Sequence, residues 1–264
     1  IDDKRYNYWQ RTSFNYETWN HLVKISKDIG LKVGISPFSR KAIDICRDLK
    51  VDFIKIGSGE VFNQDLLNYL NQNDNVIMSS GMSSLKDTVD IFNNLKNKVK
   101  NLSITHCFSS YPSTKKELDL CAINELKRLC NTKVGYSDHS GDIDIARSAI
   151  AHNADLLEVH CTFSRAMFGP DSKSSLNFEE LNKLVKFRDI FAESLGNIKN
   201  VENRDENKKI LEMKRLFGRS IALKKNFPKG YKIEREDICM KKPSEGLPYS
   251  KIDKVVNSVL KKDY

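Results

Sequence analysis

The sequence predicts an α/β protein built on a parallel sheet that is covered by helices. Apolar segments of strand length alternate with helical patterns of roughly 10–15 residues, which favours parallel strands joined by helical crossovers. Nearly every predicted strand ends in polar or titratable residues with Gly or Pro just beyond, as on the loop face of a (β/α)-barrel. A closed barrel of this type needs eight strands. The pattern supplies six, so the sheet is either open or lacks its first two strands.

The predicted elements follow one another in a regular order. Residues 1–16 have no clear period and are predicted to be a loop. The first helix covers residues 17–29, and Gly30 is expected to be its C-cap. The six strands start near Leu31, Phe53, Asn75, Leu102, Lys133 and Leu156. The other helices are expected near residues 42–49, 66–70, 85–99, 118–129 and 177–195.

The pattern of charged, apolar and turn residues changes near the end of the chain and predicts a second domain. Residues 1–197 are assigned to the barrel domain, and the charged stretch 198–215 reads as a linker. Residues 216–264 have short apolar runs cut by turns with Gly and Pro, which indicates a small, mostly β module with little core of its own.

Composition excludes several classes of protein. No apolar run approaches the ~20 residues of a membrane helix, and no signal peptide is visible. The six cysteines are scattered without a C-x-x-C spacing, which suits reduced thiols in a cytoplasmic protein. The formal charge is +9, but its lysines are spread over predicted helix surfaces without a nucleic-acid-binding motif. We therefore expect neither a nucleic-acid nor a membrane partner, although some of the charge could serve an anionic substrate.

Two histidines follow adjacent predicted strands within residues 133–176. His139 and His160 end the strands of one strand–helix–strand unit, so they should lie at the same end of the sheet. Paired imidazoles at neighbouring strand ends suit a divalent transition metal. The alternative is that nearby backbone groups satisfy both rings.

A second group of residues predicts an anion site at the same end. Lys55 lies on a strand that should be buried, and Gly57, Ser58 and Gly59 follow it, so ammonium, hydroxyl and backbone N–H groups come together. The alternative is a lysine that pairs with Glu60 or reaches solvent. With Ser79 and Ser137 from later strands, these groups suit a phosphate, or a ligand with phosphate and carboxylate groups.

Three further residues have a functional and a structural interpretation. Tyr111 could contact a polar ligand or anchor a loop, and Asp171 could orient a substrate or start a turn. His106 could be a ligand, but it lies inside an apolar strand and is predicted to be a core histidine.

Motifs along the whole chain closely resemble the N-acetylneuraminate (sialic acid) synthase family. They are KIGSGE, SSGM, HCFSSYP, GYSDHSG, EVHCTF, FGPDSKSSL and, in the tail, FGRSIA with KKP. The family includes the legionaminic and pseudaminic acid synthases and the spore-coat polysaccharide synthases. The resemblance implies a (β/α)8 barrel followed by a small antifreeze-like (SAF) β-clip domain, in a domain-swapped homodimer. It also implies an N-terminally truncated chain with little activity by itself, because the family's first two strands, with a catalytic Glu and a Lys, are not matched.

The resemblance implies a reaction as well. Phosphoenolpyruvate condenses with an open-chain aldehyde of the N-acetylmannosamine type, a C–C bond forms, and phosphate is released. The product is a nine-carbon 2-keto acid such as sialic, legionaminic or pseudaminic acid. A divalent metal, Mn²⁺ or Mg²⁺, would polarise the aldehyde.

Site roles are carried over motif by motif. Catalytic roles are implied for His139, His160 and Lys55, and the two histidines are the implied metal ligands. Phosphoenolpyruvate-binding positions are implied for Lys55, Ser58, Ser79 and Ser137. Sugar-binding positions are implied for Tyr111 and Asp171, with Glu60 beside them.

The chain departs from the family pattern at four positions. Ser36 takes the place of a Thr, and Ser109 stands where some members have Asn. Ser172 replaces the His of a GPDH motif. Lys242 replaces an Arg that binds the N-acyl group of the sugar in the partner's active site. Lys242 keeps the charge but loses the planar fork.

The sequence is also compatible with other functions. A related phosphoenolpyruvate-dependent synthase of a shorter keto acid is disfavoured by the C-terminal module. A metal-dependent aldolase or isomerase on a similar barrel is a further possibility. From another class, an inactive remnant that binds carbohydrate or acts as a scaffold is favoured by the unmatched front strands and by Ser172 and Lys242.

Overall fold

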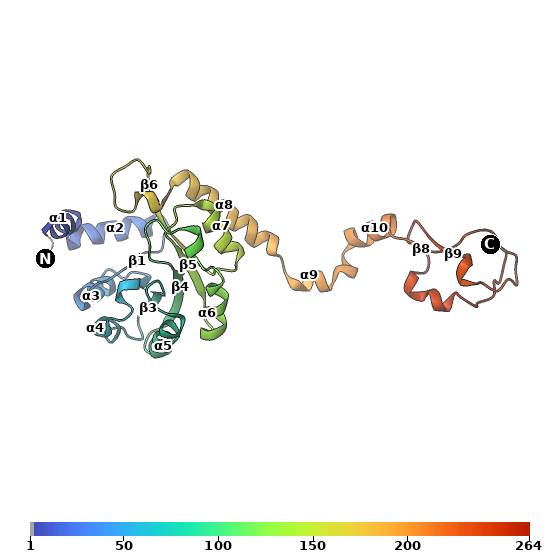
Figure 1. The fold of residues 1–264 in the computed structure, drawn as a ribbon, viewed down its shortest axis with the longest axis horizontal. Coiled ribbons are helices and arrows are strands. Elements are labelled where there is room, and N and C mark those ends of the chain that lie inside the picture. Colours follow the sequence, from blue (N-terminus) through green and yellow to red (C-terminus); the bar gives the residue numbers. More distant parts are fainter. Residues whose placement is uncertain (1–2) are drawn as a thin grey trace. The chain divides into compact units, whose positions relative to one another are not determined.

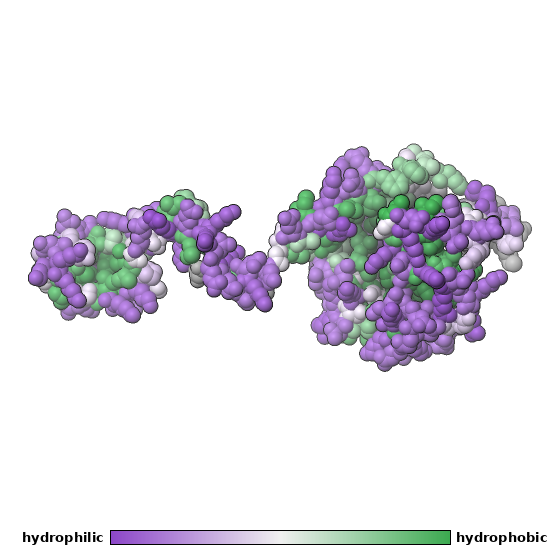
Figure 2. All heavy atoms as spheres, turned by 180° about the vertical axis from the view of Figure 1, so that it is seen from behind, coloured by the Kyte–Doolittle hydropathy of each residue, from purple (hydrophilic) through white to green (hydrophobic). Residues whose placement is uncertain are grey.

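The computed structural model describes residues 3–264 and contains two compact units (Figure 1). The first unit ends at Ala192, and the second runs from Glu193 to Tyr264. Hydrophilic residues cover most of the face shown in Figure 2, and hydrophobic residues gather in the middle of each unit. None of the helices between residues 3 and 264 is long and apolar enough to cross a membrane.

The first unit is an α/β structure with one curled parallel sheet. Its strands are β1 (Gly34–Ile35), β2 (Phe53–Ile56), β3 (Asn75–Ser79), β4 (Asn101–Cys107), β5 (Val134–Asp138), β6 (Leu157–Thr162) and β7 (Ser175–Asn177). They neighbour one another in chain order, and every pair is parallel. The predicted parallel sheet is thus confirmed, and the curled strands form a half-barrel (Figure 1). The prediction of six strands is wrong, because β7 has only three residues, too few for a hydrophobic pattern.

Helices pack on the outer face of the sheet (Figure 1). Those that connect successive strands from β1 to β6 are α3 (Arg40–Asp48), α4 (Gln64–Leu67), α5 (Leu85–Leu95), α6 (Ala122–Cys130) and α7 (Ile143–Ala151). Helix α2 (Tyr16–Asp28) precedes β1, α8 (Phe178–Leu195) follows β7, and a loop with a single 3-10 turn (Ser172–Ser174) joins β6 to β7. Side chains cap several of the helices, since Asn15, Ser39 and Ser84 accept backbone N–H groups at the starts of α2, α3 and α5.

The prediction of a loop over residues 1–16 is wrong for most of its length. The helix α1 covers Asp3–Thr12, and α2 already begins at Tyr16; residues 1 and 2 lie outside the described residues. Tyr6 and Trp9 of α1 are exposed. The apolar residues of α1 are confined to Tyr6, Tyr8 and Trp9, so its sequence lacks the repeated apolar face that predicts a helix.

The core lies between the outer face of the sheet and the helices. Alternate strand residues such as Ile56, Met78, Ile104 and Tyr136 are fully buried there. Because strand side chains alternate between faces, their neighbours Lys55, Ser79, Thr105 and Ser137 belong to the inner face. The alternation of side chains along each strand thus places apolar residues in the core and polar residues on the inner, concave face of the sheet.

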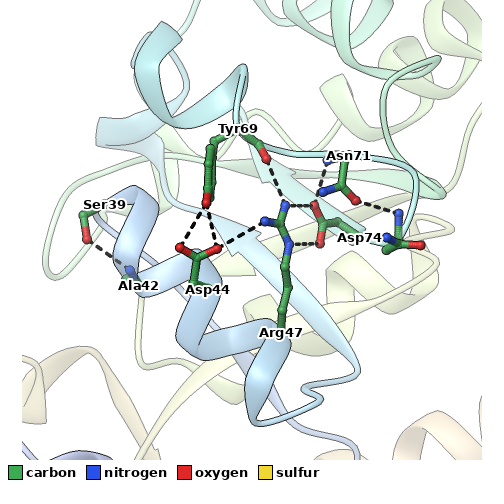
Figure 3. A network of polar contacts seen from close by, with 8 residues as sticks. Ser39, Ala42, Asp44, Arg47, Tyr69, Asn71 and Asp74 are labelled. Atoms are coloured by element: carbon green, nitrogen blue, oxygen red, sulfur yellow. Dashed lines mark hydrogen bonds and ion pairs between the residues drawn. The ribbon is translucent and has the colours of Figure 1, made fainter.

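A partly buried ion pair connects α3 to the turn before β3 (Figure 3). The guanidinium of Arg47 donates to both carboxylate oxygens of Asp74, at 3.1 and 2.8 Å, and to the carbonyl of Tyr69 at 2.9 Å. Asp74 is almost fully buried and also accepts the N–H of Asn71. This network lies at the end of β3 away from the polar strand ends.

The second unit is small and combines helices with a two-stranded ribbon. Helices α9 (Ile198–Glu202) and α10 (Lys208–Phe217) occupy most of the stretch expected to be a linker. The strands β8 (Ser220–Leu223) and β9 (Ile238–Lys241) then pair antiparallel. A small core packs beside them, formed by Phe227, Ile233, Ile238, Ile252 and Leu260.

Candidate functional site

Polar side chains of the inner face converge toward the carboxyl ends of β2 to β6. Lys55 and Ser79 come from β2 and β3, and Cys107 and Ser137 come from β4 and β5. Cys107 pairs with Ser137 in the register of the sheet, and Ser137 pairs with Glu158 of β6. These last three residues therefore form one row across neighbouring strands, at the end of the sheet where (β/α)-barrel enzymes have their active sites.

An ion pair spans the inside of the half-barrel. The ammonium of Lys55 lies 2.5 Å from a carboxylate oxygen of Glu158. In a flat sheet β2 and β6 would be about 19 Å apart, since neighbouring strands are separated by about 4.8 Å. Curling of the sheet brings the two residues together. Both line a cavity of about 620 Å³ whose wall also includes Ser36.

The structure corrects the alternative partner considered for Lys55. The carboxylate of Glu60 instead accepts a hydrogen bond from the side-chain amide of Asn63, at 2.7 Å. Glu158 binds Lys55 and was not among the predicted site residues. The signal that could have found it is its spacing: Glu158 and His160 are two residues apart on one strand and therefore share a face.

A cluster of hydroxyl groups lies beside the ion pair. The Oγ atoms of Ser58 and Ser79 are 2.8 Å apart and share a hydrogen bond. The Sγ of Cys107 lies 4.0 Å from Ser58 Oγ and 3.8 Å from Ser109 Oγ. A Cβ atom on Gly81 would lie only 2.4 Å from the Oγ atoms of Ser58 and Ser109. The absence of a side chain at Gly81 therefore permits the two serines to converge.

The two predicted metal ligands lie close together at the same end of the sheet. The ring centroids of His139 and His160 are 5.3 Å apart. Tyr111 stacks on His139 with centroids 4.2 Å apart and meets His160 edge-on at 5.9 Å. The three rings thus form one cluster, and the Sγ of Cys107, 3.7 Å from His139 Nδ1, joins it to the serines.

Burial sets the protonation of these rings. It lowers the pKa of both His139 and His160, although a hydrogen bond to the Phe108 carbonyl opposes the effect at His139 and the Asp171 carboxylate opposes it at His160. Burial also raises the pKa of the Tyr111 phenol, and the nearby Cys107 raises it further. At neutral pH the site therefore presents neutral imidazoles and a protonated phenol.

The donor chemistry of the two histidines fits a divalent metal. His139 Nδ1 lies 3.1 Å from the carbonyl oxygen of Phe108, which can only accept, so the lone pair of this ring is on Nε2. His160 Nδ1 lies 3.9 Å from a carboxylate oxygen of Asp171. Within residues 3–264 no group of three or more His, Cys, Asp or Glu side chains has the arrangement of a metal site. The protein would therefore supply two imidazole ligands to a metal here, and substrate and water would occupy the other coordination positions.

Other predicted residues lie outside this cluster or have structural partners. His106, on the face opposite Cys107, contacts the Leu118 carbonyl through Nε2 at 2.9 Å and Ser80 Oγ through Nδ1 at 3.4 Å. Lys242 belongs to the second unit, where its ammonium lies 5.2 Å from the ring centroid of Phe217.

The fold and the polar strand ends define an α/β protein with a parallel half-barrel, whose candidate site lies at the carboxyl ends of the strands, as in (β/α)-barrel enzymes. Comparison with known families then gives a definite assignment. The NeuB family profile matches residues 2–200, and this chain belongs to the NeuB family. The resemblance inferred from the motifs is confirmed.

Individual relatives agree with this assignment. The N,N'-diacetyllegionaminic acid synthase of Campylobacter jejuni is 28% identical over 267 residues, which cover 100% of this chain and 79% of the relative. The pseudaminic acid synthase of Helicobacter pylori is 28% identical over 245 residues, 92% of this chain and 71% of the relative. A crystal structure of an N-acetylneuraminic acid synthetase from Leptospira borgpetersenii, in complex with citrate, superposes with a TM-score of 0.69 at 27% identity, covering 77% of this chain and 75% of that one. All three are synthases of acidic sugars.

Proposed function

We propose that this protein condenses phosphoenolpyruvate with the open-chain aldehyde of an N-acetylated hexose, giving a nine-carbon 2-keto acid and inorganic phosphate. A C–C bond forms between C3, the methylene carbon of phosphoenolpyruvate, and the aldehyde carbon, while the C2=C3 and aldehyde C=O double bonds become single bonds. Water adds to C2, the bond from C2 to the phosphate ester oxygen breaks, and phosphate leaves with that oxygen. The observation that carries the proposal is the meeting, at one end of the sheet, of an anion-binding group of residues and a histidine pair. The names of the relatives support the class of product.

The anion-binding group consists of Lys55 and neighbouring hydroxyls. Lys55 supplies a positive charge, and its side chain is only 12% exposed. The Oγ atoms of Ser58 and Ser79 are hydrogen-bonded to each other, and both serines lie near Gly81. Ammonium and hydroxyl groups on a water-poor face suit a phosphate or carboxylate, because each charge-assisted hydrogen bond is stronger there. Ser137, on the same inner face, extends this surface. We assign phosphoenolpyruvate to this half of the site.

The histidine pair and Tyr111 form the aldehyde half. Mn²⁺ or Mg²⁺ held by His139 and His160 would act as a Lewis acid toward the aldehyde oxygen. Tyr111 stacks on His139 and is half-exposed, so it limits the motion of that ring while part of its side chain stays accessible to a ligand. The carboxylate of Asp171 accepts hydrogen bonds from sugar hydroxyls in this proposal, and its position beside His160 supports the role.

The second unit has a proposed role in a homodimer. We propose that Lys242 acts on the sugar bound by a partner copy, with Ser109 and Glu60 contributing to selectivity and Ser36 lining the cavity. A lysine offers one point charge in place of a planar fork, so a weaker hold on the N-acyl group is expected.

The experiment is a phosphate-release assay on the full-length protein with phosphoenolpyruvate and Mn²⁺. Release is expected only when N-acetylmannosamine or a similar sugar is also present. Lys55→Gln should weaken phosphoenolpyruvate binding at least tenfold, because it removes the one cation of the anion half. Lys86→Gln is the matched control, since Lys86 is an exposed residue of α5 paired with Asp90.

Release that does not depend on the sugar would overturn the proposal. Sugar binding without any phosphate release would also overturn it, in favour of a carbohydrate-binding protein.

A further inference from the structure

The loop that joins β6 to β7 carries Asp171 and has a defined internal structure. The hydroxyl of Ser172 lies 3.0 Å from the carbonyl oxygens of both Met167 and Gly169. The hydroxyl of Ser175 donates to the carbonyl of Asp171 at 2.7 Å. The position of the Asp171 carboxylate beside His160 therefore depends on how this whole loop is held.

One side chain, Arg165, connects the loop to three other segments. It donates to the carbonyl of Gly141, in the turn before α7, at 2.7 Å, and to the carbonyl of Ser175 in β7 at 2.9 Å. It also makes a bidentate pair with Glu180 of α8, at 3.0 and 2.8 Å. A guanidinium has five N–H groups in a planar fork, and these contacts use four of them.

Glu180 is itself fixed in place. Its carboxylate accepts the backbone N–H of Asn177, and its own N–H donates to the side chain of Asn177, both at 2.9 Å. Burial alone would raise the pKa of Glu180, but the hydrogen bonds from Asn177 and Arg165 outweigh it and lower that pKa. Arg165 thus meets a charged carboxylate anchored to the first turn of α8.

The contact with Gly141 shows that the loop packs closely on this turn. Gly141 has a positive φ of +66°, and a Cβ atom there would lie 2.6 Å from the carbonyl oxygen of Lys173. Only a residue without a side chain permits this approach. The loop is therefore fixed at two points, by Arg165 and by the backbone contact at Gly141.

We propose that Arg165 is a positioning residue for the sugar half of the site, which holds the loop of residues 163–174 so that Asp171 stays beside His160. The inference rests on the proposed function, in which Asp171 binds the sugar. Four of the five donors of Arg165 are already used, which argues against a role in binding substrate directly. The anion-binding residues lie on β2, β3 and β5 and in the turn after β2, and none belongs to the loop of residues 163–174, so loss of Arg165 should affect the two substrates unequally.

The test compares Arg165→Gln and the milder Arg165→Lys with the unmodified protein in two measurements. Hydrogen exchange over residues 163–174 should become at least tenfold faster in Arg165→Gln, while exchange in β2 to β5 stays unchanged. The Kd or KM for the aldehyde sugar should rise about tenfold, while that for phosphoenolpyruvate stays within twofold. Arg165→Lys should give intermediate values, because an ammonium can replace only part of the fork.

Arg188→Gln is the matched control, since Arg188 is an exposed arginine of α8 paired with its neighbour Asp189. Unchanged loop exchange in Arg165→Gln would overturn the inference whatever the protein's function. Faster loop exchange with unchanged sugar binding would overturn it too, because the loop would then not position Asp171 for the sugar. If the unmodified protein does not bind the sugar, the proposed function fails and the inference fails with it.

Discussion

The ammonium of Lys55 on β2 lies 2.5 Å from the carboxylate of Glu158 on β6, although 103 residues separate them in the sequence. This pair connects opposite sides of the half-barrel at the level where the polar strand ends begin. Any anion that binds Lys55 must share it with Glu158 or displace the carboxylate. The pair is therefore part of the site's electrostatics as well as of its shape.

Glu158→Gln should strengthen anion binding. The amide keeps the shape of the side chain but removes the negative charge that competes for Lys55, so phosphoenolpyruvate should bind several-fold more tightly in a calorimetric titration. Because the Glu158 side chain is 45% exposed, the free energy of unfolding should change by less than about 1 kcal/mol. Glu179→Gln, which alters an exposed pair with Lys183, serves as the control. Weaker binding in Glu158→Gln would show that Glu158 supports the anion and does not compete with it.

Gly81→Ala should damage the site more than the fold. The new Cβ would overlap the Oγ atoms of Ser58 and Ser109 and approach the Sγ of Cys107 to 2.9 Å, so these side chains must rotate away. Phosphoenolpyruvate affinity should fall at least tenfold, while the far-ultraviolet circular dichroism spectrum is retained. Gly59→Ala is the matched control, because nothing lies within 4 Å of a Cβ at that position. Equal affinity in the two variants would contradict the proposed convergence of the serines.

The sheet could be predicted because its signals are local. Strands such as β3 and β5 are apolar segments followed by turn residues, and the helices between them have a clear period. Asn177, the last residue of β7, also caps α8, because it exchanges two hydrogen bonds with Glu180. The sequence around Asn177 therefore resembles the start of a helix more than a strand. The helix α1 escaped prediction because it lacks an apolar face. Both elements lack the hydrophobic period on which the prediction depends.

The candidate site was predictable as a set of strand ends but not as a set of contacts. Lys55, His139 and His160 were identified from their positions after apolar strands, and the register of a parallel sheet places such positions together. The partner of Lys55 was not predictable, since Glu158 comes close only when the sheet curls. Ser172 illustrates the same point: its hydroxyl contacts carbonyls of its own loop, which motif comparison alone does not show.

Arg47→Lys should destabilise the fold without affecting the site. Arg47 makes a bidentate pair with the buried Asp74 and also contacts the Tyr69 carbonyl (Figure 3). A lysine cannot reproduce these contacts, so about 1–3 kcal/mol of unfolding free energy should be lost in urea titrations. Arg128→Lys, which alters an exposed pair with Glu125 one turn away on α6, should change stability by about 0.5 kcal/mol or less. Similar losses in the two variants would mean that the Arg47 network contributes little.

His106 should make the stability of the protein depend on pH. Burial lowers its pKa, and the hydrogen bond to the Leu118 carbonyl only partly opposes this effect. The unfolded chain therefore binds a proton more readily than the folded one, and stability should fall as pH decreases below about 6.5. In His106→Gln the amide can still donate to Leu118 but does not titrate. Because burial lowers the pKa of His139 and His160 in the same direction, the test is the difference between the two proteins. Unfolding free energies measured at pH 7.5 and 5.5 should drop more in the unmodified protein than in His106→Gln, and equal drops would exclude a buried neutral imidazole at this position.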